Sequence, residues 1–347
     1  MKPFRVALVG LGEAARHIHL PAFAGLANVE VVGGADPATP HRFPFPLFAS
    51  AEEMIEKIRP DVLAVLAPPD SHHALSRLGL NAGCHVFCEK PFVSTLEEAD
   101  ELAALARRVK RRLVVNQEYR FMQIHAAARA LVGCADFGGL LFLSAEQTFF
   151  TTPATEAGWR GDDPERTCRE FGIHVLDLCR FFFGEEPLAV TASMPSPGDA
   201  GGPDLLNLIR LDFPGGRAAH ITLDRLSKGR HRYLRMRLDG TAGAIETEIG
   251  GGIEVSAGVH GRTRRPYLRA DLSLGGRARL FHGERFRKIA SDPLDLFAHA
   301  TRRLFQAFLG ALERDEVPPC DVDDNRKSLA LVRAAYESTR RGTTVVL

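Results

Sequence analysis

The sequence predicts two domains: an α/β domain with a doubly wound parallel sheet, then an α+β domain with a large, mainly antiparallel open sheet. Within residues 1–120, short apolar stretches alternate with helical patterns, as in parallel sheets whose strands are joined by helices. From about residue 121, alternating strand patterns follow one another between glycine- and proline-rich turns. Because 347 residues exceed the usual length of one domain, we expect domains at 1–120 and 121–347.

The chain begins with a motif typical of a dinucleotide site. The apolar stretch Phe4–Val9 is followed by Gly10, Gly12 and Ala15, a Gly-x-Gly-x-x-Ala turn that leads into a helix. Gly10 allows the tight turn, Gly12 lets backbone N–H groups approach a pyrophosphate, and Ala15 permits close packing of helix on strand. This pattern predicts a Rossmann-type domain whose turn also presents Leu11, Glu13 and Ala14 to the cofactor. A carboxylate beside a pyrophosphate is unfavourable unless it points into water, which applies to Glu13.

The second predicted strand bears on the choice of cofactor. Val29–Ala35 ends on Asp36, whose carboxylate is placed to accept hydrogen bonds from a ribose diol. Because its charge repels a 2′-phosphate, we expect NAD, although NADP stays possible if His41 and Arg42 receive the phosphate. The alternative role of Asp36 is to cap the following turn. Residues 37–46 are rich in proline and predict an extended loop in place of a crossover helix.

Further strands and helices complete a predicted sheet of six parallel strands. Buried strands are expected at 61–67, 85–89 and 113–116. Capping-box patterns predict helices that begin after Ser50 and after Thr95. Ligands of open parallel sheets bind at the carboxyl ends of the strands. We therefore expect a second group of residues beside the cofactor: Ala67, Pro68, His72, Glu89, Lys90 and Asn116.

Composition and charge argue against nucleic-acid and membrane partners. The net charge is +1, no apolar run is long enough to span a bilayer, and we expect no signal segment before the first strand. The six cysteines form no Cys-x-x-Cys pair, which favours reduced thiols in the cytoplasm and no metal site. Arginine clusters at 225–237 and 262–288 leave a phosphorylated or carboxylated substrate, or nucleic acid, as an alternative. In strand-and-turn sequence, however, such residues usually face solvent or a subunit interface.

One predicted helix in the second domain, over residues 168–183, carries several ionisable side chains. Glu170, His174 and Asp177 are three to four residues apart and therefore share one face. The other face packs on the sheet through an apolar stripe of Phe171, Val175, Leu178 and Phe182.

Seven short motifs accompany the glycine turn: His19–Ala22, Ala67–His72, Glu89–Pro91, Tyr119–Phe121, Gly172–Asp177, Gly240–Gly243 and Ala334–Glu337. In order and spacing they resemble the Gfo/Idh/MocA family of nicotinamide-dependent sugar dehydrogenases, which includes glucose-fructose oxidoreductase and inositol dehydrogenase. The match extends over nearly the whole chain. It implies a cis Lys90–Pro91 bond that aims the lysine across the nicotinamide. The family usually has aspartate at the position of Glu170, after a glycine-rich run that is replaced here by Pro164–Arg169.

The resemblance implies an NAD(P)-dependent oxidoreductase acting on a secondary hydroxyl, or its ketone, of a sugar, inositol or related polyol. Such a reaction moves a hydride and needs a base for the hydroxyl proton. We assign His174 as this base, Lys90 as the cation that holds the hydroxyl and stabilises alkoxide charge, and Glu170 as the carboxylate that orients both. The alternatives are a helix histidine bonded to Asp177 or a backbone carbonyl, and a solvated strand-end lysine. Beyond these three residues, we expect substrate contacts from Tyr119, Arg120 and Trp159.

Two other functions are compatible with the same motifs. A redox-neutral enzyme would use bound NAD for a transient oxidation and release sugar from a glycoside without net NADH. A non-catalytic nicotinamide or sugar sensor would keep the fold after the change at Glu170 and in the preceding loop ended turnover. Specificity is expected from the loops at 149–169 and 195–203. By analogy with the family, we expect a homodimer or homotetramer through the exposed face of the C-terminal sheet.

Overall fold

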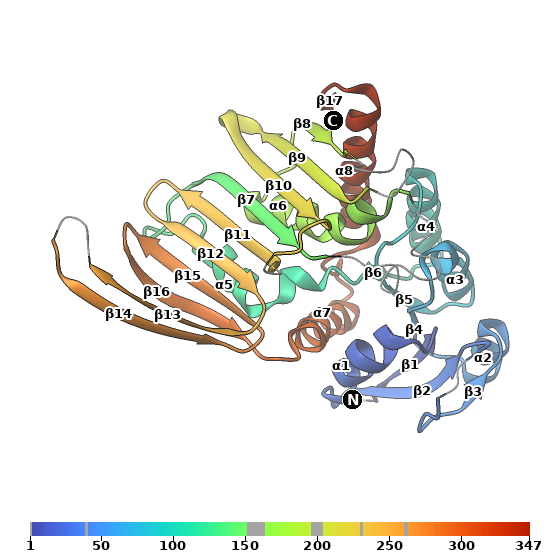
Figure 1. Cartoon of the computed structure of the whole chain (residues 1–347). Helices are drawn as coiled ribbons and strands as arrows, with labels where there is room; N and C mark the ends of the chain where they lie inside the picture. Colours follow the sequence, from blue (N-terminus) through green and yellow to red (C-terminus); the bar gives the residue numbers. More distant parts are fainter. Residues whose placement is uncertain (1, 39–40, 151–163, 196–203, 230–231, 260–262) are drawn as a thin grey trace.

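A computed structural model describes residues 2–38, 41–150, 164–195, 204–229, 232–259 and 263–347 (Figure 1). Its N-terminal part contains a six-stranded parallel sheet in the order β3-β2-β1-β4-β5-β6. The strands are β1 (Phe4–Val9), β2 (Val29–Ala35), β3 (Leu47–Phe48), β4 (Val62–Val65), β5 (His85–Cys88) and β6 (Leu113–Val115). The strand order reverses between β1 and β4, and such a reversal opens a ligand crevice at the carboxyl ends.

The predicted doubly wound sheet is confirmed, with differences at its edge. The short strand β3 lies in a region where the sequence indicates no strand, because its two residues give no readable period. The helical elements of this part are η1 (Ala15–His19), α1 (Leu20–Ala24), α2 (Ala51–Ile58), η2 (Pro69–Ser71), α3 (His72–Asn81) and α4 (Leu96–Arg108). Thr95 forms the complete capping box, and the Ser50 hydroxyl accepts from the N–H of Glu53.

The C-terminal part is built on a nine-stranded sheet in the order β16-β15-β12-β11-β7-β10-β9-β8-β17. Every neighbouring pair is antiparallel except β7 and β10, which confirms the predicted, mainly antiparallel sheet. The strands are β7 (Leu140–Thr148), β8 (Ala189–Ser193), β9 (Leu206–Phe213), β10 (Arg217–Asp224), β11 (Arg232–Gly240), β12 (Ala244–Ile249), β15 (Gly276–His282), β16 (Arg285–Asp292) and β17 (Val345–Val346).

Helices cover one face of this sheet and bury its main apolar core. They are α5 (Gln123–Leu131), α6 (Ile173–Phe183) and α8 (Val322–Arg341), and short helical turns lie at η3 (Glu118–Phe121), η5 (Thr167–Gly172) and η6 (Pro214–Gly216). The predicted helix over 168–183 therefore divides into a π-helical turn and an α-helix. Its stripe residues Val175, Leu178 and Phe182 are fully buried, as an apolar face packed on a sheet requires.

Helix α7 (Leu296–Glu313) connects the two parts of the molecule (Figure 1). The rings of Phe305 and Phe308 lie 5.0 and 6.1 Å from that of Phe87 on β5, so a late segment of the chain completes the core of the parallel sheet. The division at residue 120 stays a prediction. Among the described residues, no helix combines the length and apolar character needed to cross a membrane.

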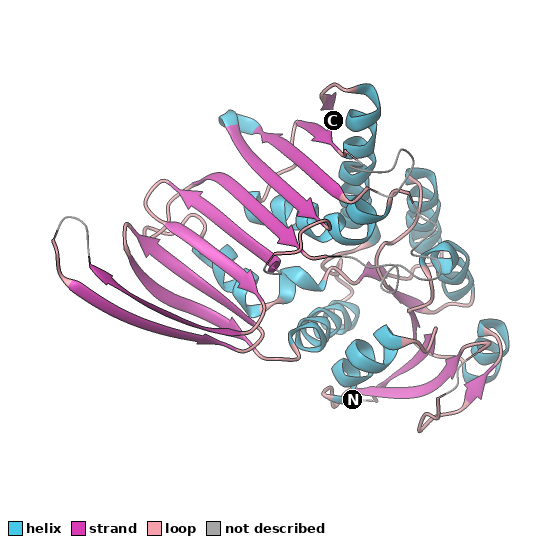
Figure 2. Cartoon of the chain, in the orientation of Figure 1, coloured by secondary structure: helices cyan, strands magenta, loops and turns pink. Residues whose placement is uncertain are grey.

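A two-stranded ribbon of β13 (Gly252–Val259) and β14 (Pro266–Ser273) projects beyond the nine-stranded sheet, as Figure 2 shows. Several of its large apolar side chains are mostly exposed, among them Ile253 at 77% and Leu268 at 76%. Exposed apolar patches of this kind mark interaction sites.

Candidate active site

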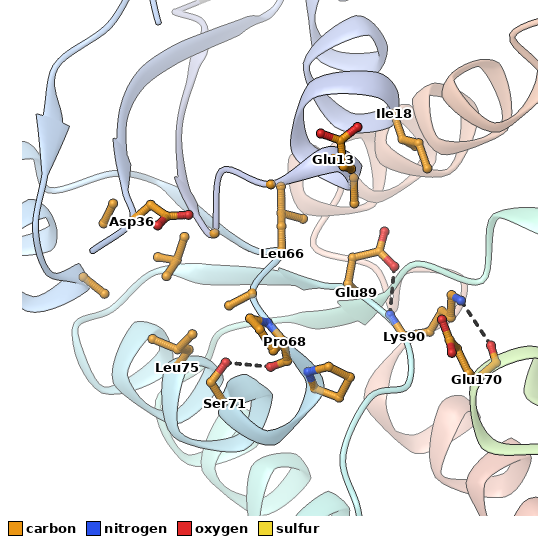
Figure 3. Close-up of a pocket in the computed structure, with 18 of the residues that line it drawn as sticks. Glu13, Ile18, Asp36, Leu66, Pro68, Ser71, Leu75, Glu89, Lys90 and Glu170 are labelled. Carbon is orange, nitrogen blue, oxygen red and sulfur yellow. Dashed lines mark hydrogen bonds between the residues drawn. The ribbon is translucent and has the colours of Figure 1, made fainter. Parts of the chain in front are cut away.

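A cavity of about 870 Å³ opens at the carboxyl ends of the parallel strands and extends to the second sheet. Nine of the residues expected to contact the cofactor line it: Gly10, Gly12, Glu13, Ala14, Asp36, Ala67, Pro68, Glu89 and Lys90. Four of the expected substrate contacts line it: Lys90, Tyr119, Glu170 and His174. In Figure 3, Asp36, Pro68, Glu89 and Lys90 surround this space, and Glu170 approaches Lys90 from the other part of the chain.

Four expected site residues in the described part of the chain are not part of this wall. Leu11, His72 and Asn116 are buried behind it, and Arg120 lies in an ion-pair network described below. The side chains of the first three pack or hydrogen-bond within the protein, and their direct contact with the cofactor stays a prediction. Trp159 lies outside the described residues.

The two glycines of the turn are required for different reasons. Gly10 has φ +87°, and a Cβ there would lie 2.5 Å from the backbone nitrogen of Ala67, so the two strand-end loops touch at this point. A Cβ on Gly12 would meet nothing within 4 Å, which leaves free space where the helix begins. This open cradle fits a pyrophosphate. Glu13 is 77% exposed and pairs with Arg16 and His17, so its carboxylate is turned into water.

Asp36 combines the two roles that its position suggests. Its Oδ2 accepts from the N–H of Leu11 at 2.8 Å, and its Oδ1 accepts from the N–H of Ala38 at 2.9 Å. The carboxylate thus caps its own turn and fastens the glycine turn, while the residue still lines the cavity. Each carboxylate oxygen has a further lone pair, so these bonds leave capacity for a ribose diol.

Glu89 forms the base on which Lys90 is positioned. Its Oε1 accepts from Nε2 of His19 at 2.6 Å and from Nδ2 of Asn116 at 2.8 Å, and its Oε2 accepts from the N–H of Lys90 at 3.0 Å. Although burial opposes the charge, the bond from His19 and the nearby cations lower the pKa of Glu89 to about 2. Asn116 therefore acts through Glu89. The Lys90–Pro91 bond is cis, as the resemblance implies.

His72 ties two cavity loops together from behind. Its Nδ1 and Nε2 donate to the carbonyl oxygens of Pro91 and Ala67, both at 2.8 Å. Burial opposes a charged ring, but the contact with Cys88 and the two carbonyl bonds raise the pKa of His72 to about 9. Because both ring nitrogens donate, the charged form holds the loops after β4 and β5 at a fixed separation.

Lys90 reaches the second part of the chain through a backbone contact. Its Nζ donates to the carbonyl oxygen of Glu170 at 3.1 Å and lies 5.6 Å from the ring centre of Phe171. The Glu170 carboxylate forms an ion pair with Nε of Arg166 at 3.0 Å, one helical turn earlier. In this structure Arg166 bonds to the carboxylate and the main chain of Glu170 bonds to the lysine, and the role of the Glu170 carboxylate in orienting Lys90 and His174 stays a prediction.

His174 is buried and has a defined protonation pattern. Its Nδ1 donates to Oε1 of Gln117 at 2.9 Å, because an amide oxygen can only accept. Burial, followed by the charge of Lys90, lowers the pKa of His174 well below its ordinary value. The ring of Tyr119 stacks on it with centres 4.0 Å apart and planes 1° from parallel. The ring is thus neutral, fixed in place, and presents the unprotonated Nε2.

Asp177 and Arg120 form a structural network. Nε of Arg120 donates to Oδ2 of Asp177 at 2.6 Å, and Nη1 of Arg120 donates to Asp324 on α8 at 2.8 Å. The contact of Arg120 with substrate stays a prediction, and His174 and Asp177, three residues apart in α6, share one face of that helix. The cationic partner of Asp177 comes from η3, and the π-helical turn before α6 shifts Glu170 relative to His174.

The lining residues that sequence reasoning did not identify include Glu118, Tyr233 and Phe297 near the expected substrate contacts. Glu118 follows β6 at the same edge as Asn116, so the strand-end rule provides a signal for it. Tyr233 and Phe297 come from β11 and the start of α7, and no local pattern links either residue to the site. Their rings lie 5.3 Å apart and form an aromatic wall.

Comparison with known proteins identifies both parts of the chain. Residues 4–117 match the family model described as oxidoreductase family, NAD-binding Rossmann fold, and residues 125–246 match the Gfo/Idh/MocA C-terminal domain. The chain is 26% identical to D-apiose dehydrogenase of Paraburkholderia graminis, with all of this chain and 90% of that protein covered. It is 27% identical to inositol 2-dehydrogenase of Rhizobium meliloti, over 76% of this chain and 81% of that protein.

A solved structure supports the same fold. An oxidoreductase from Agrobacterium radiobacter, in complex with NAD+, L-tartaric acid and magnesium, superposes with a TM-score of 0.82 at 19% identity. The superposition covers 99% of this chain and 98% of the other. The N-terminal part is thus an NAD-binding Rossmann domain, which confirms the cofactor class expected from the glycine turn.

Proposed function

This chain belongs to the Gfo/Idh/MocA family of NAD(P)-dependent oxidoreductases, and on that basis we propose that it oxidises a secondary hydroxyl of a sugar, inositol or related polyol, or reduces the ketone. The observation that carries the proposal is the pairing of Lys90 with a neutral, fixed His174 in a cavity continuous with the glycine turn. The names of the D-apiose and inositol dehydrogenases to which the chain is similar support a substrate of this class.

The residues of the cavity divide the work between them. The open cradle at Gly12 and the loop at Ala67 and Pro68 would hold the dinucleotide, whose nicotinamide supplies the hydride acceptor or donor when it is bound. Lys90 binds the hydroxyl oxygen and stabilises negative charge that develops on it. Nε2 of His174 accepts the hydroxyl proton, since Nδ1 is already occupied by Gln117.

The charge pattern around Asp36 supports NAD as the preferred cofactor. A carboxylate at the end of β2 attracts ribose hydroxyls and repels a 2′-phosphate. Arg16 lies nearby, but its Nη1 is within 3.0 Å of His41 Nε2 and pairs with Glu13 at 2.7 Å. NADP remains the second cofactor to test.

An assay tests the dehydrogenase directly. The purified protein is mixed with NAD or NADP and a panel of sugars, sugar acids, inositols and polyols, and reduced nicotinamide is followed by absorbance. Lys90→Met and His174→Ala are each expected to lower kcat by about 10²- to 10⁴-fold while cofactor binding by calorimetry is kept. Lys57→Met, at an exposed lysine of α2, is the matched control. Normal turnover in both site variants contradicts the assignment.

The same assay separates the two alternative functions. Release of sugar from a glycoside without net NADH indicates the redox-neutral enzyme. Tight cofactor binding without turnover on any member of the panel indicates the sensor.

We also propose that copies of this chain associate in the cytoplasm as a homodimer or homotetramer through the C-terminal sheet. Support comes from the exposed apolar side chains of the β13–β14 ribbon, which connects β12 to β15 of the C-terminal sheet. All six cysteines, each among the described residues, are free thiols, as suits a reducing compartment. Light scattering on wild type and on Ile253→Glu tests the assembly, and an unchanged mass for the variant counts against the ribbon.

A further inference from the structure

Glu118 occupies a position in the cavity that the mechanism above does not use. It begins η3, directly after the last parallel strand, and only 5% of its surface is exposed. Its Oε1 lies 4.0 Å from Nε2 of His174, the nitrogen that faces the reaction. Its Oε2 is buried and has no hydrogen-bond partner among the described residues. A buried carboxyl oxygen without a partner is costly unless a ligand or water completes it.

The charges around Glu118 come from several elements. Glu89 and Lys90 face it from the end of β5, His174 and Asp177 belong to α6, and Tyr233 lies on β11. Burial is the largest influence and the charge of Glu89 adds to it, while Lys90 opposes both. Together they raise the pKa of Glu118 to about 8. At neutral pH the side chain is therefore mostly a neutral carboxylic acid that can donate a hydrogen bond.

The separation of the two groups fits one shared atom. At 4.0 Å, Oε1 of Glu118 and Nε2 of His174 are too far apart for a direct hydrogen bond. A single oxygen atom between them can lie within hydrogen-bond distance of both. A hydroxyl group at this point can donate a hydrogen bond to Nε2 of His174 and accept one from the carboxylic acid of Glu118. The site is thus complementary to a carbinol, and the acid alone is complementary to a ketone.

We propose that Glu118 is a second acid–base group of the reaction, which contacts the reacting oxygen together with His174. This inference rests on the proposed function. In oxidation, the O–H bond breaks and its proton goes to His174, while the hydrogen on carbon leaves with its electron pair to the oxidised nicotinamide that the proposed reaction supplies. After the carbonyl product leaves, a water molecule in the same position relays the proton from His174 to ionised Glu118. In reduction the same steps run in reverse: neutral Glu118 returns its proton to His174 through that position, the carbon receives the hydride, and His174 gives the proton to the oxygen.

Physical reasons favour a second group over His174 alone. His174 is buried beside Lys90, so an imidazolium there is unfavourable and cannot keep the proton. When ionised Glu118 takes that proton it becomes neutral, and burial and the charge of Glu89 favour its neutral form. Oxidation should therefore speed up as pH rises through about 8, and reduction should slow over the same range.

Glu118→Gln gives the sharpest test, because the amide keeps the shape and neutral donor of the acid but cannot exchange a proton. We expect the pH dependence of kcat near 8 to disappear in both directions and kcat to fall at least about tenfold, with KM changed little. Glu118→Asp, which keeps a carboxyl group, should retain the pH limb at reduced rate. Glu101→Gln, on the exposed surface of α4, is the control and should match wild type.

A second readout does not depend on turnover. Because the pKa of Glu118 is raised on folding, wild type should lose stability as pH rises from about 4.5 to about 8. Glu118→Gln should lack this part of the slope, which denaturant unfolding at several pH values measures. If His174→Ala abolishes turnover but Glu118→Gln keeps the pH dependence of the wild type, the role of Glu118 is overturned and the proposed function still stands. Wild type without turnover on any polyol overturns the proposed function itself, and the stability slope then still reports the buried acid.

Discussion

Nε2 of His19 lies 2.6 Å from Oε1 of Glu89, at the point where the first helix passes behind the end of β5. The opposite oxygen of Glu89 holds the backbone N–H of Lys90. The position of the lysine is therefore fixed by a histidine that never reaches the cavity. Figure 3 shows the bond between Glu89 and Lys90.

Glu89→Gln should destabilise the protein and misplace the lysine. One end of the amide becomes a donor, so a buried N–H loses its acceptor, at a cost of about 1–3 kcal/mol in unfolding free energy. Since the pKa of Glu89 is lowered to about 2, its contribution is present above about pH 4.5 and is lost as pH falls toward 2. Denaturant unfolding at neutral and acidic pH checks this. Exposed Glu97→Gln is the control, and an equal loss in both variants would contradict it.

The two turn glycines provide a matched pair of substitutions. Gly12→Ala adds a methyl group in open space, so it should leave stability nearly unchanged and weaken NAD binding about tenfold or more. Gly10→Ala drives the same group into the backbone of Ala67 at positive φ, and should lower stability by roughly 1–3 kcal/mol. Calorimetry with NAD and thermal unfolding separate the effects. Loss of stability in Gly12→Ala would contradict the open space inferred beside Gly12.

Asp36→Asn tests the choice of cofactor. The amide oxygen can still accept one of the two backbone N–H bonds, from Leu11 or Ala38, but the other bond and the negative charge near the ribose are lost. NAD binding should weaken about tenfold, or about 1.4 kcal/mol, while NADP binding is unchanged or improves. Titration with each cofactor measures both constants. If both weaken equally, the role of Asp36 is confined to its bonds with Leu11 and Ala38.

Arg120→Met tests whether this arginine is structural. Removing it leaves Asp177 buried at 1% exposure without its main partner, which should cost about 3–5 kcal/mol. Arg326→Met, which removes an exposed ion pair with Asp100, should cost less than about 1 kcal/mol. Urea unfolding compares the two variants. A substrate KM that rises for Arg120→Met well below its melting temperature would support the substrate contact expected from the sequence.

Local patterns predict the first domain well because its signals are short-range. The glycine turn, the buried strand at 62–65 and the capping box at Thr95 each depend on neighbours within a few residues. Parallel strands also align their carboxyl ends by topology alone, so Lys90 and Pro68 can be placed at one edge without knowledge of distances.

The partners of the site side chains depend on contacts between distant segments. Tyr233 and Phe297 reach the cavity only because β11 and α7 fold back onto it. Arg166 takes the carboxylate of Glu170, and Gln117 holds His174, where the alternative interpretation of the sequence named Asp177 or a backbone carbonyl. Each of these outcomes follows from competition between several possible partners, which sequence spacing does not rank.

By itself, the sequence determined the two fold classes, the dinucleotide turn and the identity of the lysine and histidine beside it. The fold classes and the turn follow from periodicity and from backbone requirements that only glycine or a strand end can meet, and the lysine and histidine follow from the family resemblance and the need of the implied reaction for a base. The tertiary structure alone decided which groups are buried together, and so the protonation of His174 and Glu118. The physical reason is that a pKa is set by desolvation and by charges within a few ångströms, which come from segments far apart in the chain.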